Sequence, residues 1–368
     1  MAIYIHEHKE WPNFYWKHES IALKSANVRH HQGRLTGRME GIGFSLQAEA
    51  NLHILTLDVL KSSEIEGEIL NPDQVRSSIA RRLGMDIAGL IPADRNVEGM
   101  VEMMLDATTD YNALLTDERL FSWHAAMFPT GRSGMHRIVV GNYRDNSMAD
   151  PMQVISGPMS KEKGHFQAPD SNVLVSEMNK FLSWFNSGKD LDPVIKAAIA
   201  HLWFVTIHPF DDGNGRNTRA ITDMQLSRAD QSAQRFYSMS SQIRAERNEY
   251  YDILEKTQKG TLDITAWLEW FLNCLDRAMA NTDEPLAVVL KKARFCEKHL
   301  TTMLNDRQRT MLNKLLDGFD GKMTSSKWAK ISKTSQDTAG RDINDLLERG
   351  ILVKEAGGGR STSYILTP

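Results

Sequence analysis

The chain has 368 residues, of which 41% are hydrophobic and 25% are charged, a composition typical of a soluble globular protein long enough for two or three domains. Its 44 lysines and arginines against 47 aspartates and glutamates leave a formal net charge of −3, which excludes a molecule that binds polyanions through its whole surface. Two cysteines are too few for a disulfide framework, no apolar stretch is long enough for a membrane span and the N-terminus is too polar for a signal peptide, so we expect a cytoplasmic protein with no membrane partner.

The first third of the chain passes from an irregular region into helices. Residues 1–43 mix short extended-looking pieces with three glycines, Gly33, Gly41 and Gly43. From residue 45 apolar residues recur at helical spacing, which predicts a helix to residue 66 with Gly67 as its stop signal. Pro72 suits the first turn of the next helix, and helical periodicity then dominates residues 97–123.

In the middle of the chain the sequence pattern changes from helical to β-prone and then becomes helical again. Residues 135–144 and 151–169 are short β-prone runs punctuated by glycine, and the second predicts a hairpin or flap with its turn near residues 160–164. Further helices are expected over residues 173–185, 193–207, 216–226, 250–260 and 263–280.

The C-terminal part has the pattern of a winged helix-turn-helix. Three helices are expected over residues 306–316, 326–332 and 336–349, followed by two strands around a glycine turn. The third of these helices, at residues 336–349, is the predicted recognition helix. It carries Arg341 but also Asp342 and Asp345, which favours weak DNA binding at most. Winged helices also dock proteins, so the sequence leaves both uses open.

One dodecapeptide, HPFDDGNGRNTR at residues 208–219, concentrates polar chemistry directly after an apolar helix. It has neither the Gly-Lys-Ser/Thr of a P-loop nor the third glycine of a dinucleotide turn. Its Gly-Asn-Gly nevertheless precedes a predicted helix, where backbone N–H groups and the helix dipole favour an anion. Arg216 and Arg219 lie three residues apart and point to one side of that helix, which suits a polyphosphate.

Two further residues of the dodecapeptide complete a reaction site. His208 can take a proton from a hydroxyl, because a histidine titrates near neutral pH. Asp212 can hold a Mg²⁺ ion that bridges phosphate oxygens. A base, a metal carboxylate, an anion nest and two arginines are the parts needed for nucleophilic attack on a nucleotide phosphate.

The dodecapeptide resembles the signature motif of the Fic family, His-Pro-Phe-x-Asp/Glu-Gly-Asn-Gly-Arg-x-x-Arg, and matches every fixed position. Most Fic enzymes transfer AMP from ATP to a protein hydroxyl. The resemblance implies that His208 is the catalytic base, that Asp212 binds Mg²⁺ and that the following residues bind ATP. These residues are Gly213, Asn214, Gly215, Arg216, Asn217, Thr218 and Arg219.

Other segments carry the same resemblance. The stretch SSEIEG at residues 62–67 is similar to the family's inhibitory pattern Ser/Thr-x-x-x-Glu-Gly/Asn, with Ser62, Glu66 and Gly67 at the fixed positions. GNYR at residues 141–144 and the 151–169 hairpin resemble the segment that docks a target protein in extended form. YYDILEKTQ resembles the stretch that closes the adenosine pocket, which implies ATP contacts for Tyr250, Tyr251 and Gln258; the two tyrosines could equally be core aromatics.

The resemblance covers nearly the whole chain and implies a mainly α-helical fold in three domains. These are an N-terminal domain with the inhibitory helix (1–95), a Fic catalytic domain with a β-hairpin flap (96–284) and a winged helix-turn-helix domain (285–368). Similar N-terminal and winged-helix additions occur in one bacterial Fic subgroup.

We therefore expect a protein adenylyltransferase that uses ATP and Mg²⁺, modifies a Ser, Thr or Tyr hydroxyl of a target protein or of itself, and is inhibited by its own 62–67 segment. The alternatives are removal of AMP from a modified target, transfer of another phosphate ester on the same scaffold, or a DNA-binding regulator whose Fic domain only senses nucleotide. The target, any DNA site and the oligomeric state, a homodimer included, stay open.

Overall fold

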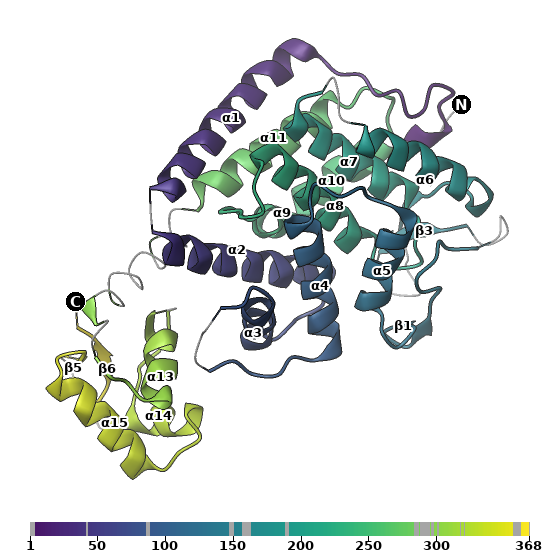
Figure 1. Cartoon of the computed structure of the whole chain (residues 1–368). Coiled ribbons are helices and arrows are strands. Elements are labelled where there is room, and N and C mark those ends of the chain that lie inside the picture. Colours follow the sequence, from purple (N-terminus) through teal and green to yellow (C-terminus); the bar gives the residue numbers. More distant parts are fainter. Residues whose placement is uncertain are drawn as a thin grey trace.

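The structure is a computed structural model of the chain, and it is built mainly from helices (Figure 1). It describes residues 4–41, 43–85, 89–146, 151–156, 163–187, 191–282, 287, 295, 298–299, 302–316, 318–319, 321–355 and 362–367.

The N-terminal and central helices enclose one hydrophobic core that runs from Ile5 to Met279. The first elements are η1 (Ile5–Glu7), α1 (His18–Glu40), α2 (Phe44–Ile65), α3 (Pro72–Arg82), α4 (Arg95–Thr109) and α5 (Asp117–Met127). The elements that follow the central hairpins are α6 (Ser171–Asn186), α7 (Pro193–Ile207), α8 (Asn214–Asp230), α9 (Met239–Ala245), α10 (Arg247–Gln258) and α11 (Thr265–Ala280).

The long helix α1 is the main departure from the sequence prediction, which expected extended pieces over residues 1–43. Its buried residues follow helical spacing and pack the helix against α11: Ile21, Ser25, Val28, Gln32, Leu35 and Met39. Gly33 and Gly37 lie on the open side, where a β-carbon would meet nothing within 4 Å. The prediction was wrong because glycine was weighed as a breaker, whereas tertiary packing supplies most helical stability.

The helix starts follow capping chemistry that the sequence contains. Asn71 accepts hydrogen bonds from the N–H groups of Asp73 and Gln74, with Pro72 in the first turn of α3. Asp192 does the same for α7, where Pro193 occupies the first turn. The predicted helix over residues 45–66 is confirmed as α2, and Gly67 follows it with a φ of 85°.

Helix α7 is the centre of the molecule. Its residues from Val194 to Ile207 are buried, apart from the half-buried Lys196. It packs most extensively against α8, and α6 and α11 also cover it (Figure 1). Because α7 and α8 are consecutive and antiparallel partners in the core, the loop between them is held at both ends by rigid helices.

Two short antiparallel hairpins lie between α5 and α6. Strands β1 (Arg132–Ser133) and β2 (His136–Arg137) form the first, and β3 (Gln153–Ser156) and β4 (Lys163–Gln167) form the second, with an irregular register between Val154 and Ile155. The predicted hairpin within 151–169 is thus confirmed. Its turn lies mostly outside the described residues.

The C-terminal part has a core of its own, which includes Met311, Trp328, Ile343, Leu346 and Leu352. Its elements are α13 (Asp306–Leu316), α14 (Ser325–Ile331), α15 (Gln336–Glu348), β5 (Leu352–Lys354) and β6 (Tyr364–Leu366). Three helices and an antiparallel strand pair are consistent with the predicted winged helix-turn-helix. The predicted domain boundaries stay predictions.

Helices long and apolar enough to cross a membrane do not occur in the part of the chain that the structure describes.

Candidate active site

The signature dodecapeptide forms the connection between α7 and the first turns of α8. His208 ends α7 with φ 52° and ψ 59°, a left-handed conformation that a non-glycine residue adopts only where its surroundings hold it. Its N–H still donates to the carbonyl of Phe204 at 3.0 Å. Gly213, with φ 79°, lies at the N-cap of α8. The loop therefore turns sharply at both ends, and His208 stands next to the N-terminus of α8.

Arg144 supports the histidine backbone from outside the dodecapeptide. Its side chain is buried and donates from Nε to the carbonyl of His208 at 2.8 Å, while its own N–H donates to the carbonyl of Pro209 at 2.9 Å. It also donates to the carbonyl of Pro169, beyond the second hairpin. Arg144 thereby fixes the strained turn at His208 and joins it to the flap.

His124 of α5 supports the other half of the loop. It is fully buried and stacks on Phe210, with ring centres 4.3 Å apart. Its Nδ1 accepts the N–H of Gly141 at 3.2 Å, so Nε2 carries the proton and donates it to the carbonyl of Asp212 at 3.1 Å. Burial holds the pKa of His124 below its ordinary value, which keeps this neutral form.

The side chain of His208 is prepared to act as a base. Nδ1 lies 3.3 Å from the carbonyl of Val205, to which it donates, and this contact leaves Nε2 as the basic nitrogen. Burial is the main cause that lowers the pKa of His208 to about 4, and the Arg144 guanidinium adds to that effect. The histidine is therefore neutral at physiological pH.

The first turn of α8 forms a cradle for an anion, and a carboxylate already lies in it. A β-carbon at position 215 would be 2.1 Å from Oε1 of Glu66, so only glycine allows this approach. A β-carbon at position 213 would be 2.9 Å from the ring of Phe128, against which the loop also packs. Backbone N–H groups and the positive end of the helix dipole at Gly215 suit the negative charge of Glu66.

Arg219 connects α8 to the end of α2. Its Nε donates to Oγ of Ser62 at 2.8 Å, and its Nη2 donates to the Ser62 carbonyl at 2.8 Å and to Oε1 of Glu66 at 2.7 Å. The arginine side chain is only 2% exposed. Ser62 in the last turn of α2 and Glu66 at its C-cap are four residues apart, and both contact Arg219 of the signature helix.

Arg216 is held by a carboxylate from the same segment. Its Nη1 donates to Oε2 of Glu68 at 2.8 Å, and its guanidinium lies over the Phe128 ring, 4.9 Å from the ring centre. Nε of Arg216 and Nη1 of Arg219 are buried without a hydrogen-bond partner in the described part of the chain. Both arginines therefore retain donors for a further anion.

Asp212 is the carboxylate best placed to meet a metal ion at the loop. One oxygen accepts from the Ser133 hydroxyl and the other from the N–H of Gly213, while 42% of the side chain stays exposed. No group of three or more histidine, cysteine, aspartate or glutamate residues that could hold a metal ion occurs among the described residues. One exposed carboxylate would suffice for a Mg²⁺ ion that also takes substrate phosphates and water as ligands.

Comparisons with known proteins give the families that two parts of the chain match. The model of the Fic/DOC family matches residues 114–226, and a domain of unknown function, DUF4172, matches residues 4–85. The match to the Fic/DOC family thus includes α7, the signature loop and most of α8.

The relatives of the Fic domain include proteins with a stated activity. The protein adenylyltransferase Fic of Aedes aegypti is 29% identical over 228 residues, which are 60% of this chain and 40% of that protein. The protein of the same name from Culex quinquefasciatus is 28% identical over 229 residues, again 60% of this chain and 40% of the relative. The chain thus spans about two fifths of the length of these curated relatives.

Solved structures show the same fold. A Fic family protein from Desulfovibrio desulfuricans G20 superposes with a TM-score of 0.53 at 19% identity, over 96% of this chain and 97% of that one. A Fic domain containing signaling protein from Bacteroides thetaiotaomicron VPI-5482 gives 0.51 at 20% identity, over 71% of this chain and 97% of that one.

Three predicted nucleotide ligands in the Fic domain lie on the inner side of α8. Asn214 exchanges two hydrogen bonds with the backbone of Phe210, at 2.9 and 2.7 Å. Asn217 donates to the Gly213 carbonyl at 3.0 Å, and Thr218 donates to the Asn214 carbonyl at 2.7 Å. These side chains are buried and shape the loop, and a direct contact with ATP remains a prediction.

The three residues predicted to close the adenosine pocket lie on α10. Tyr250 is 2% exposed and its hydroxyl lies 3.0 Å from Nε2 of His201, so it belongs to the core. Tyr251 is half-buried, with the Arg247 guanidinium 5.2 Å from its ring centre. Gln258 is buried and donates to Oγ1 of Thr206 at 3.3 Å. Contacts of these residues with the adenosine stay predictions.

Sequence reasoning missed the support that Arg144 and His124 give to the loop, and it missed Glu68. The first two act through backbone carbonyls of the loop and lie 64 and 88 residues from their partners, so no local spacing marks them. Glu68 directly follows the recognised inhibitory pattern, and a search for carboxylates next to that pattern could have found it.

Proposed function

We propose that this chain is a protein adenylyltransferase, which transfers AMP from ATP to a Ser, Thr or Tyr hydroxyl of a protein, itself included. The observation that carries the proposal is a neutral His208 whose basic Nε2 stands beside an anion cradle and two buried arginines in a Fic domain. The names of the curated relatives support the reaction type.

In the proposed reaction, Nε2 of His208 takes the proton of the target hydroxyl as its oxygen attacks the α-phosphorus of ATP. The new oxygen–phosphorus bond forms while the bond to the bridging oxygen of the β-phosphate breaks, and pyrophosphate leaves. The backbone N–H groups at Gly213–Gly215 and the free donors of Arg216 and Arg219 stabilise the charge on the phosphates. Histidine returns its proton to solvent.

The metal would enter with its nucleotide. We propose that Asp212 binds the Mg²⁺ ion of the ATP complex, since 42% of its side chain is exposed and it lies at the start of the cradle. When bound, Mg²⁺ neutralises charge on the phosphate oxygens. Arg144 and His124 hold the backbone carbonyls of His208 and Asp212, so the carboxylate of Asp212 would keep a fixed position relative to the histidine.

The 62–67 segment would restrain this activity. Glu66 lies where a phosphate would meet Gly215 and already occupies Nη2 of Arg219. If this carboxylate moves away, ATP can bind productively. If the carboxylate stays, ATP binds with a displaced phosphate, and its α-phosphorus is misaligned for attack. We therefore propose autoinhibition through Ser62, Glu66 and Gly67, with Ser62 anchoring the arginine from the helix.

The target would lie along the second hairpin. An extended peptide can pair with an edge strand through main-chain hydrogen bonds, and these bonds do not depend on the sequence of the peptide. Arg144 connects this hairpin to the His208 carbonyl, so a peptide held there has a fixed relation to the base. The C-terminal winged helix-turn-helix is proposed as a separate unit that docks a partner, DNA among the candidates.

The test compares α-labelled with γ-labelled ATP in the presence of Mg²⁺, with the full chain and its His208→Ala variant. Protein labelled only from the α-phosphate is the expected result, and the variant should lose about 10²–10⁴-fold in rate while it still binds ATP. Labelling only from the γ-phosphate would mean phosphoryl transfer. Equal labelling by the alanine variant would remove the histidine from the mechanism.

A further inference from the structure

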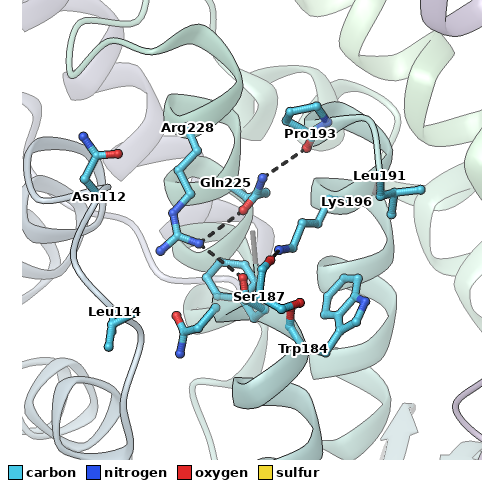
Figure 2. Close-up of a pocket in the computed structure, with 11 residues that line it drawn as sticks. Asn112, Leu114, Trp184, Ser187, Leu191, Pro193, Lys196, Gln225 and Arg228 are labelled. Carbon is cyan, nitrogen blue, oxygen red and sulfur yellow. Dashed lines mark hydrogen bonds between the residues drawn. The ribbon is translucent and has the colours of Figure 1, made fainter. Parts of the chain in front are cut away.

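A cavity lies near the start of α7 and the end of α8, whereas the signature loop joins the other ends of these helices. Figure 2 shows residues that line it. Its volume is about 580 Å³, within the size range of small-molecule sites. Pro193, the first residue of α7, lines it, whereas His208 follows the last residue of that helix. A 15-residue helix rises roughly 22 Å, so this cavity is separate from the proposed ATP site.

Two cations reach into the cavity, Lys196 from α7 and Arg228 from α8, with Gln225 between them (Figure 2). Their hydrogen bonds go to neutral groups: Lys196 donates to the Ser187 carbonyl, and Arg228 donates to the carbonyls of Tyr111 at 2.7 Å and Ala113 at 2.9 Å. Within the described part of the chain, neither forms an ion pair with a carboxylate.

The position of Lys196 is electrostatically unfavourable in the free protein. It lies in the N-terminal turns of α7, where the helix dipole disfavours a cation. The nearby carboxylate of Asp192 is engaged with Arg29 at 3.1 Å and caps the helix with its other oxygen. Burial, and then the charge of Arg228, lowers the pKa of Lys196 to about 8.

Arg228 is also buried next to another cation. Burial and the nearby Arg119 lower the pKa of Arg228 to about 10, although its place in the last turn of α8 suits the helix dipole. Two desolvated cations that face one cavity are stabilised most effectively by a bound anion.

Aromatic and apolar side chains supply another part of the wall, beside the polar residues Asn112, Asn186 and Ser187. The Phe185 ring centre lies 4.7 Å from the Arg228 guanidinium carbon and 5.9 Å from Nζ of Lys196, so both cations converge on one ring. Trp184 is half-buried, and its ring centre lies 5.3 Å from Nζ of Lys196. Leu114 is 62% exposed and also lines the cavity.

We propose that this cavity binds a small organic anion, with a phosphate or carboxylate group held by Lys196 and Arg228 and a planar ring placed along Trp184 and Leu114. Two cationic donors recognise the charged group, and the indole and leucine surfaces replace water around the ring. The buried Gln225 amide, between the cations, adds polar atoms that orient the ligand.

The experiment is isothermal titration calorimetry on the full chain with phenyl phosphate and, in a separate arm, phenylacetate. We expect saturable binding of at least one probe, and the tighter probe identifies the charged group. The Lys196→Gln variant should weaken that binding at least tenfold, and Lys196→Arg should keep most of it, because the cation remains.

Two controls of matched charge loss complete the test. The Lys180→Gln variant removes a lysine of α6 that pairs with Glu177 at 2.8 Å, and it should bind like the parent chain. The Arg219→Gln variant alters the signature helix and should also bind normally. No saturable binding of either probe, equal binding by Lys196→Gln, or a loss in Arg219→Gln in place of Lys196→Gln would overturn the proposal.

Discussion

Replacement of Glu66 by glycine should convert the chain into a more active self-modifying enzyme. In the structure Oε1 of Glu66 lies 2.7 Å from Nη2 of Arg219 and in direct contact with the backbone of Gly215. A phosphate cannot occupy the same volume. The substitution removes the carboxylate and returns a buried guanidinium to the nucleotide.

The size of the effect follows from the interaction that ATP must displace. A hydrogen bond to a charged group contributes about 1.5–3 kcal/mol. Because the Glu66 side chain is 31% exposed, we take the lower part of that range, about 1.5–2 kcal/mol. Since 1.4 kcal/mol corresponds to a factor of ten, activation of roughly 10- to 30-fold is expected from competition alone. A phosphate displaced by about 1 Å could raise it to the order of 10²-fold.

Folding should tolerate the change. Glu66 follows the last residue of α2 and lies at its C-cap, where glycine costs less than the roughly 1 kcal/mol of a helix interior. Glu64→Gly is the matched control: Glu64 pairs with Lys61 and Arg244 and does not contact the signature arginines.

The assay is self-labelling from α-labelled ATP with Mg²⁺, with the parent chain and both variants at equal concentration and with matched thermal unfolding. We expect a strong gain for Glu66→Gly and little change for Glu64→Gly. Equal rates for the parent and a folded Glu66→Gly variant would refute the reasoning, and equal activation by both variants would assign the effect to a loosened helix end.

Three further predictions follow from other contacts. Glu68→Gln should raise self-labelling less than Glu66→Gly does, because it frees Arg216 but leaves the Glu66 carboxylate in the anion cradle. The labelling rates of both single variants and of the double variant check this. A double variant that labels no faster than Glu66→Gly would contradict the prediction. A chain ended at residue 282 should keep its self-labelling, because the two hydrophobic cores are separate; a folded but inert truncation would show that the C-terminal part completes the site. Burial lowers the pKa of His201 from 6.5 to about 3, so its contribution to stability is complete above pH 6.5 and is lost as pH falls toward 3, by up to about 1.4 kcal/mol per pH unit. Burial raises the pKa of Asp58 to about 7, and this shift makes the folded state more stable as pH falls, which opposes the effect of His201. The measurement is therefore the difference in free energy of unfolding in urea between the parent and His201→Gln, from pH 6.5 to 4. Parallel pH profiles for the two proteins would contradict the prediction.

The sequence was most informative where chemistry is local. Twelve consecutive residues contain the proposed base, the glycine turn and both arginines, and an Asp-Pro pair predicts the start of α7 from backbone chemistry alone. The helix over residues 45–66 and its glycine stop followed from periodicity, because an amphipathic helix repeats its buried positions within a few residues.

The same local reasoning failed for α1. Its buried stripe is spread over 23 residues and includes the polar residues Ser25 and Gln32, and Gln32 donates a hydrogen bond to Asp230 at the end of α8. No rule of composition distinguishes these polar residues from exposed ones. The glycines on the open face then weighed against a helix that packing stabilises.

The sequence by itself predicted which residues carry the proposed chemistry, and it placed Ser62 and Glu66 four residues apart at the end of one helix. Only the tertiary structure decided that this face meets Arg219, 153 residues beyond Glu66, and that Glu68 meets Arg216. It also decided that Arg144 and His124 hold the loop through backbone carbonyls. Such contacts join segments far apart in the chain, and they arise because the helices pack around one shared core, so residue spacing contains no record of them.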